Sequence, residues 1–185
     1  MADEKIQELA ELLDPDDDDE LAIDDVSAPR ETKRIKVQNL IGALEYGEMY
    51  AQNGVASQTL SSGSYTKVTQ FLSNGLASDD VTPDHTNDKL TINRTGIYMV
   101  GLHVSFGGSG SVSWDVAVFQ AGLETHIEFE RKLGATGDIG AGAAFGFLDI
   151  TSAPTDLDIR AQPDGASKTF QVHHAQFLVL RLANT

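Results

Sequence analysis

Five histidines are the side chains of this chain that could hold a metal ion or act as a general base. A zinc site needs three or four ligands that converge on one point. His173 and His174 are neighbours in a stretch typical of a strand, where successive side chains point to opposite faces. No serine lies in a pattern that resembles a nucleophile elbow, so we do not expect a serine hydrolase. We expect histidines at the surface, the core edge or a subunit interface: His85, His103, His126, His173 and His174.

Paired carboxylates could serve as the acid and base of a glycosidase. Such an enzyme holds two carboxyl groups roughly 5–10 Å apart in a sugar-binding cleft. The pairs Asp79/Asp80 and Asp156/Asp158 lie instead in predicted turns or along predicted strands. The acidic loop around Pro83 offers the oxygen ligands that calcium prefers, although a solvated polar loop accounts for the same residues. We therefore predict a protein that is not an enzyme, with no catalytic residue, metal ion or cofactor.

Five glycines are concentrated in the stretch RKLGATGDIGAGAAFG, from Arg131 to Gly146. A phosphate-binding loop would need a preceding strand, a following helix and, in its Walker form, a closing Gly-Lys-Ser/Thr, which this stretch lacks. We instead predict a long flexible connection between strands, because glycine adopts backbone conformations that other residues avoid. In this connection Arg131, Lys132 and Asp138 are candidates for contact with an external surface.

The formal net charge of −15 is unevenly distributed. Residues 1–31 contain 13 acidic and 2 basic side chains, whereas residues 32–185 contain 15 and 11. A negative field repels phosphate groups, so we expect no nucleic-acid partner. The absence of cysteine excludes disulfides and Cys-ligated metals, and no apolar run reaches the roughly 20 residues of a membrane span. The beginning, MADEKIQELAELL, is acidic where a secretory signal is basic, so we expect cytoplasmic synthesis and no membrane partner.

Residues 1–45 are predicted to form a separate acidic segment. Apolar residues at helical spacing from Ile6 to Leu13 predict a short helix, which ends before Pro15. Two strand-like pieces, 20–26 and 32–37, then predict a hairpin followed by a short helix around Leu40. A segment this small cannot bury enough apolar area to fold alone, so we expect it to bind a partner surface.

From residue 46 to residue 185 the sequence alternates between strands and turns. Turns recur roughly every 8 to 14 residues, which predicts an all-β, antiparallel sandwich of the jelly-roll type. Tyr98, Val100 and Leu102 share one parity in the clearest of these strands. The candidate strands are 46–51, 65–72, 89–93, 96–106, 112–120, 125–132, 143–149, 156–162 and 169–182.

The last candidate strand carries apolar residues on both of its faces. One parity comprises Phe170, Val172, Leu178, Leu180 and Leu182, and the other comprises Ala175, Phe177 and Val179. In a small sandwich, a strand buried on both sides indicates that another subunit covers its second face. We therefore predict a symmetric homo-oligomer with Ala175, Phe177 and Val179 at its interface.

The acidic segment resembles a leader common at the N-termini of tailed-bacteriophage fibre and appendage proteins. That leader has Asp-rich residues, a strand reading roughly Leu-x-Ile-x-Asp, and then Glu-Thr-Lys-Lys-Ile-x-Val-x-x-Leu. The matching positions are Asp19, Leu21, Ile23, Asp25, Val26, Glu31, Thr32, Lys33, Arg34, Ile35, Val37 and Leu40. The resemblance implies attachment to a phage capsid or tail protein, with Leu21, Ile23, Ile35, Val37 and Leu40 as candidate contacts.

The remainder resembles the tumour-necrosis-factor-like and complement-globular-head jelly roll. The resemblance rests on RTGIYMVGLHVSFGGSG (94–110), with its Gly-x-Tyr-x-Val strand, and on the closing FQVHHAQFLVLRL. In that family the last apolar strand lines a threefold axis. The resemblance implies a compact homotrimeric head, residues 46–185, displayed on a virion.

Together these observations predict a non-enzymatic bacteriophage virion protein. It would be a trimeric capsid decoration, head fibre or short tail fibre, anchored through residues 1–45, and its head could contact a host-surface glycan or protein. The alternative is a small carbohydrate-binding or carbohydrate-active module. That alternative would need solvent-facing aromatic side chains for sugar stacking, and most aromatic residues here lie at core-like parity.

Overall fold

The computed structural model describes residues 20–25, 31–36 and 44–184, and the chain divides into two compact units after Ala43. In the first unit, β1 (Glu20–Asp25) pairs antiparallel with β2 (Glu31–Lys36), which confirms the predicted hairpin. Leu21 lies opposite Ile35 in this hairpin. The two predicted short helices, together with Val37 and Leu40, lie outside the described residues. The second unit begins at Leu44, two residues before the predicted boundary.

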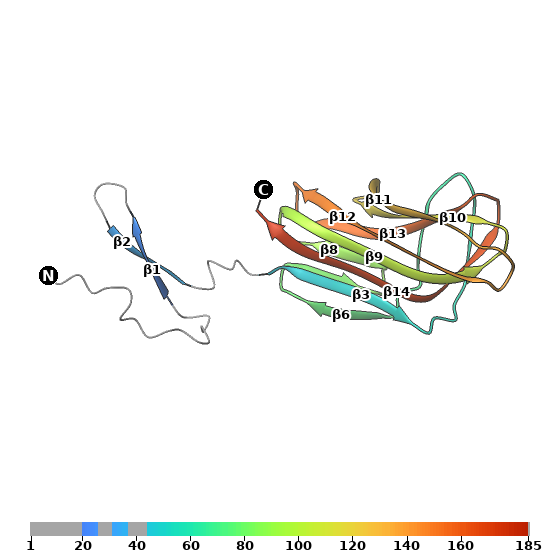
Figure 1. Ribbon diagram of the computed structural model, residues 1–185, viewed down its shortest axis with the longest axis horizontal. Helices are drawn as coiled ribbons and strands as arrows, with labels where there is room; N and C mark the ends of the chain where they lie inside the picture. The colour runs from blue at the N-terminus through green and yellow to red at the C-terminus, as the bar shows by residue number, and fades with distance from the viewer. Residues whose placement is uncertain (1–19, 26–30, 37–43, 185) are drawn as a thin grey trace. The chain divides into compact units, whose positions relative to one another are not determined.

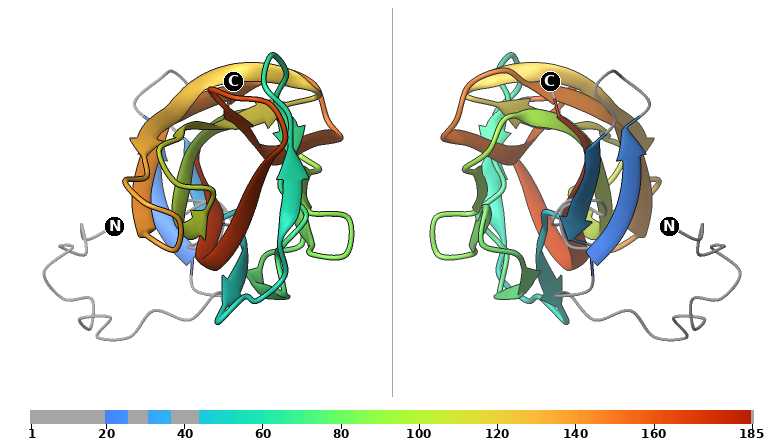
Figure 2. Two further views of the ribbon diagram at one scale, coloured as in Figure 1. Left: turned by 90° about the vertical axis from the view of Figure 1, so that its right-hand side faces the viewer. Right: turned by 90° about the vertical axis from the view of Figure 1, so that its left-hand side faces the viewer.

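The second unit is a sandwich of two antiparallel six-stranded sheets that face each other across one core (Figures 1 and 2). The first sheet has the order β12-β9-β14-β3-β6, with β4 paired to β14. The second sheet has the order β11-β10-β13-β8-β7, with β5 paired to β13. The predicted all-β jelly-roll sandwich is therefore confirmed. The strands are β3 (Tyr46–Gln52), β4 (Gln58–Leu60), β5 (Thr66–Lys67), β6 (Ser73–Ala77), β7 (Val81–Asp84), β8 (Lys89–Ile92), β9 (Gly96–Gly108), β10 (Ser113–Gln120), β11 (Leu123–Lys132), β12 (Ile139–Ile150), β13 (Thr155–Pro163) and β14 (Lys168–Ala183).

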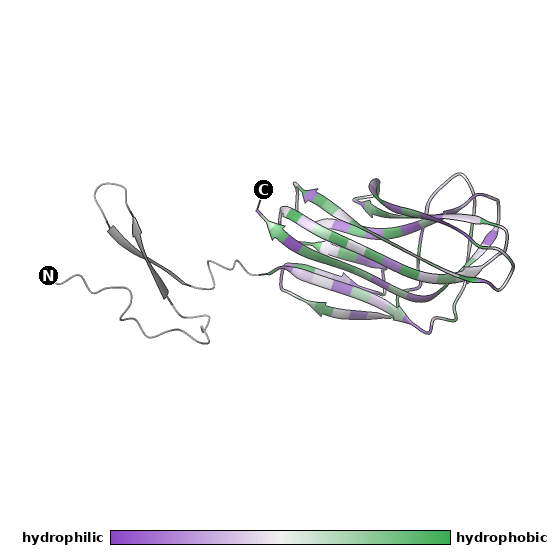
Figure 3. Cartoon of the chain, viewed as in Figure 1, coloured by the Kyte–Doolittle hydropathy of each residue, from purple (hydrophilic) through white to green (hydrophobic). Residues whose placement is uncertain are grey.

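An aromatic cluster joins the two sheets in the core. Trp114 of β10 lies 4.9 Å from Phe170 of β14, measured between ring centroids, and Phe170 lies 4.7 Å from Phe106 of β9. All three side chains are fully buried. Figure 3 shows the alternation of apolar and polar residues along the strands that puts one face of each sheet into this core. Each buried side chain of this size contributes roughly 1.5–3 kcal/mol to folding, so the cluster strongly favours the face-to-face arrangement of the sheets.

The glycine-rich stretch forms a connection only over residues 133–138 and otherwise lies in β11 and β12, so the connection is shorter than predicted. β12 runs antiparallel to β9 from Ile139 to Ile150, and only a short turn separates it from β11. A Cβ atom on Gly142 would lie 2.2 Å from the ring of Phe129 on β11. The glycines therefore let β11 of the second sheet and β12 of the first approach each other closely at the edge of the sandwich.

A β-bulge interrupts the alternation of β14. The register with β9 shifts between Val172 and His174, so both Val172 and Ala175 face the core. His173 and His174 consequently both lie on the outer side of the strand, contrary to the prediction that they face opposite ways. Three short strands, β4, β6 and β7, were not predicted; β6 contains Asn74 and Gly75 and β7 contains Pro83, residues that are typical of turns. In the described part of the chain, no helix has the length and apolarity needed to cross a membrane.

Candidate interaction surface

An apolar patch lies on the outer face of the first sheet, near the end where the chain enters the sandwich. One row of paired residues crosses four strands from Phe147 through Met99 and Leu180 to Tyr46. The side chain of Phe147 is 59% exposed and that of Tyr46 is 41% exposed. We call this patch the apolar face; its members are Tyr46, Leu76, Met99, Phe145, Phe147, Leu178, Leu180 and Leu182.

A second row explains the shape of the apolar face. Phe145 on β12 pairs with Gly101 on β9, and Gly101 pairs with Leu178 on β14. Gly101 has no side chain, so Leu178 lies over its backbone. A Cβ atom added to Gly101 would lie 3.4 Å from the Leu178 side chain, an ordinary van der Waals distance. A shallow hollow of about 280 Å³ remains between Leu76, Leu178 and Leu180, and Glu48, which pairs with Leu178, also lines it. Phe145, at 80% exposed, stands at the edge of this surface, where a second molecule could cover it.

Polar residues occupy the next rows of the same face. His103, Gln176 and Tyr50 lie side by side on β9, β14 and β3. The Gln176 Nε2 atom donates a hydrogen bond of 2.9 Å to Glu48. With His174 these residues line a hollow of about 340 Å³. The outer face of the first sheet thus changes from apolar to polar along the strands.

The predicted interface residues Ala175, Phe177 and Val179 point the other way. Their exposed fractions are 6%, 0% and 1%, and all three belong to the sandwich core. The bulge at His174 reverses the parity that a continuous strand would have from Phe170 onward. The prediction that these three residues lie at a subunit interface is therefore wrong, because they lie in the core of one subunit. A molecule that covered β14 would contact Leu178, Leu180 and Leu182 of the opposite parity.

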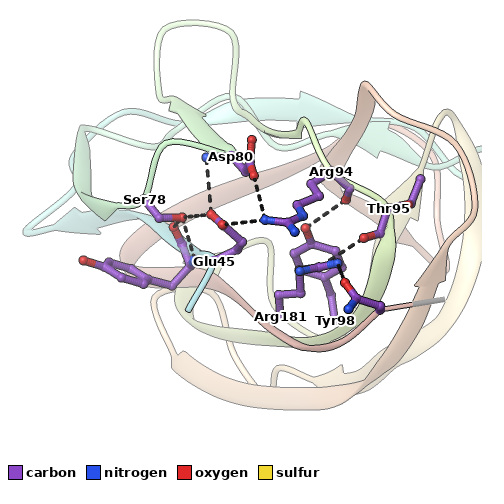
Figure 4. A network of polar contacts seen from close by, with 9 residues as sticks. Glu45, Ser78, Asp80, Arg94, Thr95, Tyr98 and Arg181 are labelled. Atoms are coloured by element: carbon purple, nitrogen blue, oxygen red, sulfur yellow. Dashed lines mark hydrogen bonds and ion pairs between the residues drawn. The ribbon is translucent and has the colours of Figure 1, made fainter. Parts of the chain in front are cut away.

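A network of charges closes the end of the sandwich where the chain enters it (Figure 4). The Glu45 carboxylate, 4% exposed, lies 3.4 Å from the Arg94 guanidinium and accepts a 2.7 Å hydrogen bond from the Ser78 hydroxyl. The Arg181 backbone N–H donates to the Glu45 carbonyl at 2.7 Å. Tyr98 donates its phenolic hydrogen to the Arg94 carbonyl at 2.9 Å. These contacts tie the first residues of the sandwich to β14 and fix the border of the apolar face.

Carboxylates on the second sheet form ion pairs with neighbouring cations. Asp156 accepts hydrogen bonds from Lys89 at 2.9 Å and from Thr91 at 2.7 Å. Although its burial raises the pKa of Asp156, these two donors outweigh burial and the pKa is lowered overall. Asp158 pairs with Arg160 at 2.7 Å. The two carboxylates therefore act as ion-pair partners within the sheet.

The outer surface of β10 and β11 contains carboxylates that lie close to one another. Asp115 pairs with Glu130 across the two strands. Burial, followed by repulsion from Glu130 and Asp164, raises the pKa of Asp115. Burial also raises the pKa of Tyr65, and the neighbouring Glu124 raises it further. This surface is negatively charged and favours a partner with basic groups over an anionic one.

The predicted surface contacts Arg131, Lys132 and Asp138 are all exposed. Asp138 lies in the turn before β12, where its carboxylate accepts a 2.7 Å hydrogen bond from the Ala135 N–H. Among the described residues, no group of three His, Asp or Glu side chains is placed to hold a metal ion. The outward pair Phe145 and Phe147 was not predicted, although their i, i+2 spacing on one parity of β12 is a signal for an apolar outer face.

Solved structures with a similar fold include murine APRIL and the globular domain of zebrafish complement 1qA. Murine APRIL at pH 5.0 superposes with a TM-score of 0.53 and 13% identity, over 75% of this chain and 100% of that one. The globular domain of zebrafish complement 1qA superposes with a TM-score of 0.50 and 11% identity, over 77% of this chain and 99% of that one. The fold is a TNF-like, complement-head-like jelly roll. No family model matches the sequence, and no curated protein matches it.

Proposed function

We propose that this protein is a non-enzymatic structural protein whose jelly-roll head assembles as a homotrimer through the apolar face. The observation that carries the proposal is the row Phe147–Met99–Leu180–Tyr46 on the outer side of the first sheet. A monomer would leave these side chains in water, at a cost of about 25 cal/mol for each Å² of apolar surface. Copies of the same chain supply an equally apolar surface, and a closed symmetric ring lets each copy bury it.

A single charged substitution tests this assembly. Leu180→Glu places a carboxylate in the middle of the apolar face, and we expect the mass in solution to fall from three chains to one. Val55→Glu is the matched control, because Val55 is 86% exposed and lies outside the apolar face. Fluorescence of the single, fully buried Trp114 reports whether each variant is folded. A folded Leu180→Glu variant that remains trimeric would contradict the proposal.

We further propose that residues 1–45 attach the trimer to a tailed-bacteriophage particle, as a capsid decoration, head fibre or short tail fibre. The support is the resemblance of the segment to phage leaders, together with the hairpin that pairs Leu21 with Ile35. Three copies of the segment on one trimer would convert a weak contact into a firm one by raising the effective concentration. Residence of the protein in the virion follows from this proposal, and the displayed head is then available to contact a host-surface glycan or protein.

Incorporation into particles tests the attachment. We expect the double variant Ile23→Asp and Ile35→Asp to be lost from purified particles while the purified protein keeps the mass of a trimer. Val55→Glu in the same particles controls for expression and for added charge. Normal incorporation of the double variant would contradict attachment through this hairpin, and it would leave the trimer proposal intact.

A further inference from the structure

A third hollow lies at the end of the first sheet opposite the end where the chain enters the sandwich. Its volume is about 430 Å³, within the range of roughly 300–1,000 Å³ that small-molecule sites occupy. Two rows of paired residues, one that contains His103 and one that contains His174, lie between this hollow and the apolar face. We call it the distal hollow; its lining residues are Gly107, Gly108, Ser109, Thr136, Gly137, Ile139, Thr169, Gln171 and His173.

Hydrogen bonds fix the walls of the distal hollow. The Ser109 N–H donates to the Thr169 carbonyl at 3.0 Å, and the Thr169 N–H donates to the Ser109 hydroxyl oxygen at 3.0 Å. Gly107 makes room for the imidazole of His173, because a Cβ atom there would lie 2.9 Å from the His173 Nε2 atom. Gly108 has a φ of 151°, a conformation that other residues rarely adopt, and an added Cβ would strike Thr169. Gly107 and Gly108 therefore let His173 and Thr169 pack against the backbone, whereas the space beside Gly137 is open.

The chemistry of the lining selects a class of ligand. The nine residues offer three hydroxyl groups, the Gln171 amide, the His173 imidazole and glycine backbone, and none of them is a lysine, an arginine or a carboxylate. An anion would meet no lysine or arginine in this lining and would be repelled by a chain of net charge −15. Ile139, which is 62% exposed, supplies the aliphatic side chain of the lining. An uncharged ligand with many hydroxyl groups satisfies these donors and acceptors.

We propose that the distal hollow binds a neutral carbohydrate through the side chains of Gln171 and His173. The hydroxyl groups of the sugar exchange hydrogen bonds with these two side chains and with the threonine hydroxyls, and its apolar ring face lies on Ile139. Binding here uses hydrogen bonds in place of the stacking aromatic residues that a carbohydrate-binding module commonly presents. The site is contained within one subunit, so it does not depend on the trimer.

Saturation-transfer NMR on the full-length protein tests the proposal. The probes are the methyl glycosides of glucose, galactose, mannose and N-acetylglucosamine, each at up to about 50 mM, which detects Kd values well into the millimolar range. Inorganic phosphate and sialic acid serve as charged comparison probes. We expect at least one neutral glycoside to bind and the charged probes not to bind.

Two variants in the hollow and one neighbour locate the site. Gln171→Ala and His173→Ala should each weaken binding about tenfold, the effect of losing one good hydrogen bond. His174→Ala is the matched control, because His174 is the next residue and lines the other polar hollow. Light scattering on the same samples shows that each variant keeps the parent mass. No binding by any neutral glycoside, binding by the charged probes alone, or equal binding by the parent and both hollow variants would overturn the proposal.

Discussion

Replacement of Gly142 by alanine tests whether the glycines of β12 are required by the close approach of β11. An ideal Cβ atom at this position lies 2.2, 2.3 and 2.7 Å from three carbons of the Phe129 ring. Real Cβ contacts are longer, so the ring or the strand must move by more than 1 Å. Overpacking of this kind costs about 1–3 kcal/mol, whereas replacing a strand glycine by alanine otherwise stabilises by roughly 0.5–1 kcal/mol. We therefore expect a net loss of about 0.5–2 kcal/mol.

The assay is thermal and urea unfolding followed by Trp114 fluorescence at one fixed protein concentration. In a domain of this size the melting temperature should fall by about 1–8 °C. Gly101→Ala is the matched control, since an added Cβ there lies 3.4 Å from Leu178, an ordinary contact. Combination with Phe129→Leu completes a double-mutant cycle, in which the cost of Gly142→Ala should largely disappear.

Two outcomes would refute this reasoning. If Gly142→Ala is as stable as the parent protein, β12 does not lie close enough to Phe129 to need glycine. If the cost is the same with leucine at position 129, the strain arises from the backbone and not from the aromatic ring. In either case the explanation of the glycine-rich stretch as a tightly apposed edge strand would be wrong.

The remaining predictions concern charge. Because burial and neighbouring carboxylates raise the pKa of Asp115, its ionisation disfavours the folded state, and stability is lost as the pH rises from about 4 through the raised pKa. Asp115→Asn should therefore be more stable than the parent at pH 7 and no more stable at pH 3 in urea unfolding; the same difference at both pH values would contradict this. Glu45→Ala removes the partner of Arg94 and Ser78 and should cost about 1–3 kcal/mol in the same assay, whereas no change would show that the network in Figure 4 does not hold the end of the sandwich.

The sequence predicts most of the fold because alternation is a local signal. The parity of Tyr98, Val100 and Leu102 places β9 correctly in the core, and Trp114 does the same for β10. A bulge is different, because one inserted residue changes every orientation after it, and nothing in the neighbourhood of His173 reveals the insertion. Alternation counted from Phe170 therefore assigns the residues after His174 to the wrong face of β14.

The glycine-rich strand and the candidate sites depend on contacts between distant segments. Gly142 is compatible with a turn or with a crowded strand, and only the position of Phe129 decides between them. The distal hollow likewise combines Thr136 with Gln171 and His173, which pairing through β9 brings together. Such combinations depend on the register of three strands, whereas the sequence pattern indicates each strand separately.

The mass of the full-length protein in solution tests the central claim most directly. Light scattering coupled to size exclusion should be run at two protein concentrations. We predict a mass near three times the 19.9 kDa chain at both concentrations, with the apolar face buried between subunits. A mass near one chain at both concentrations would contradict the trimer and would require a different molecule to cover Phe147 and Leu180.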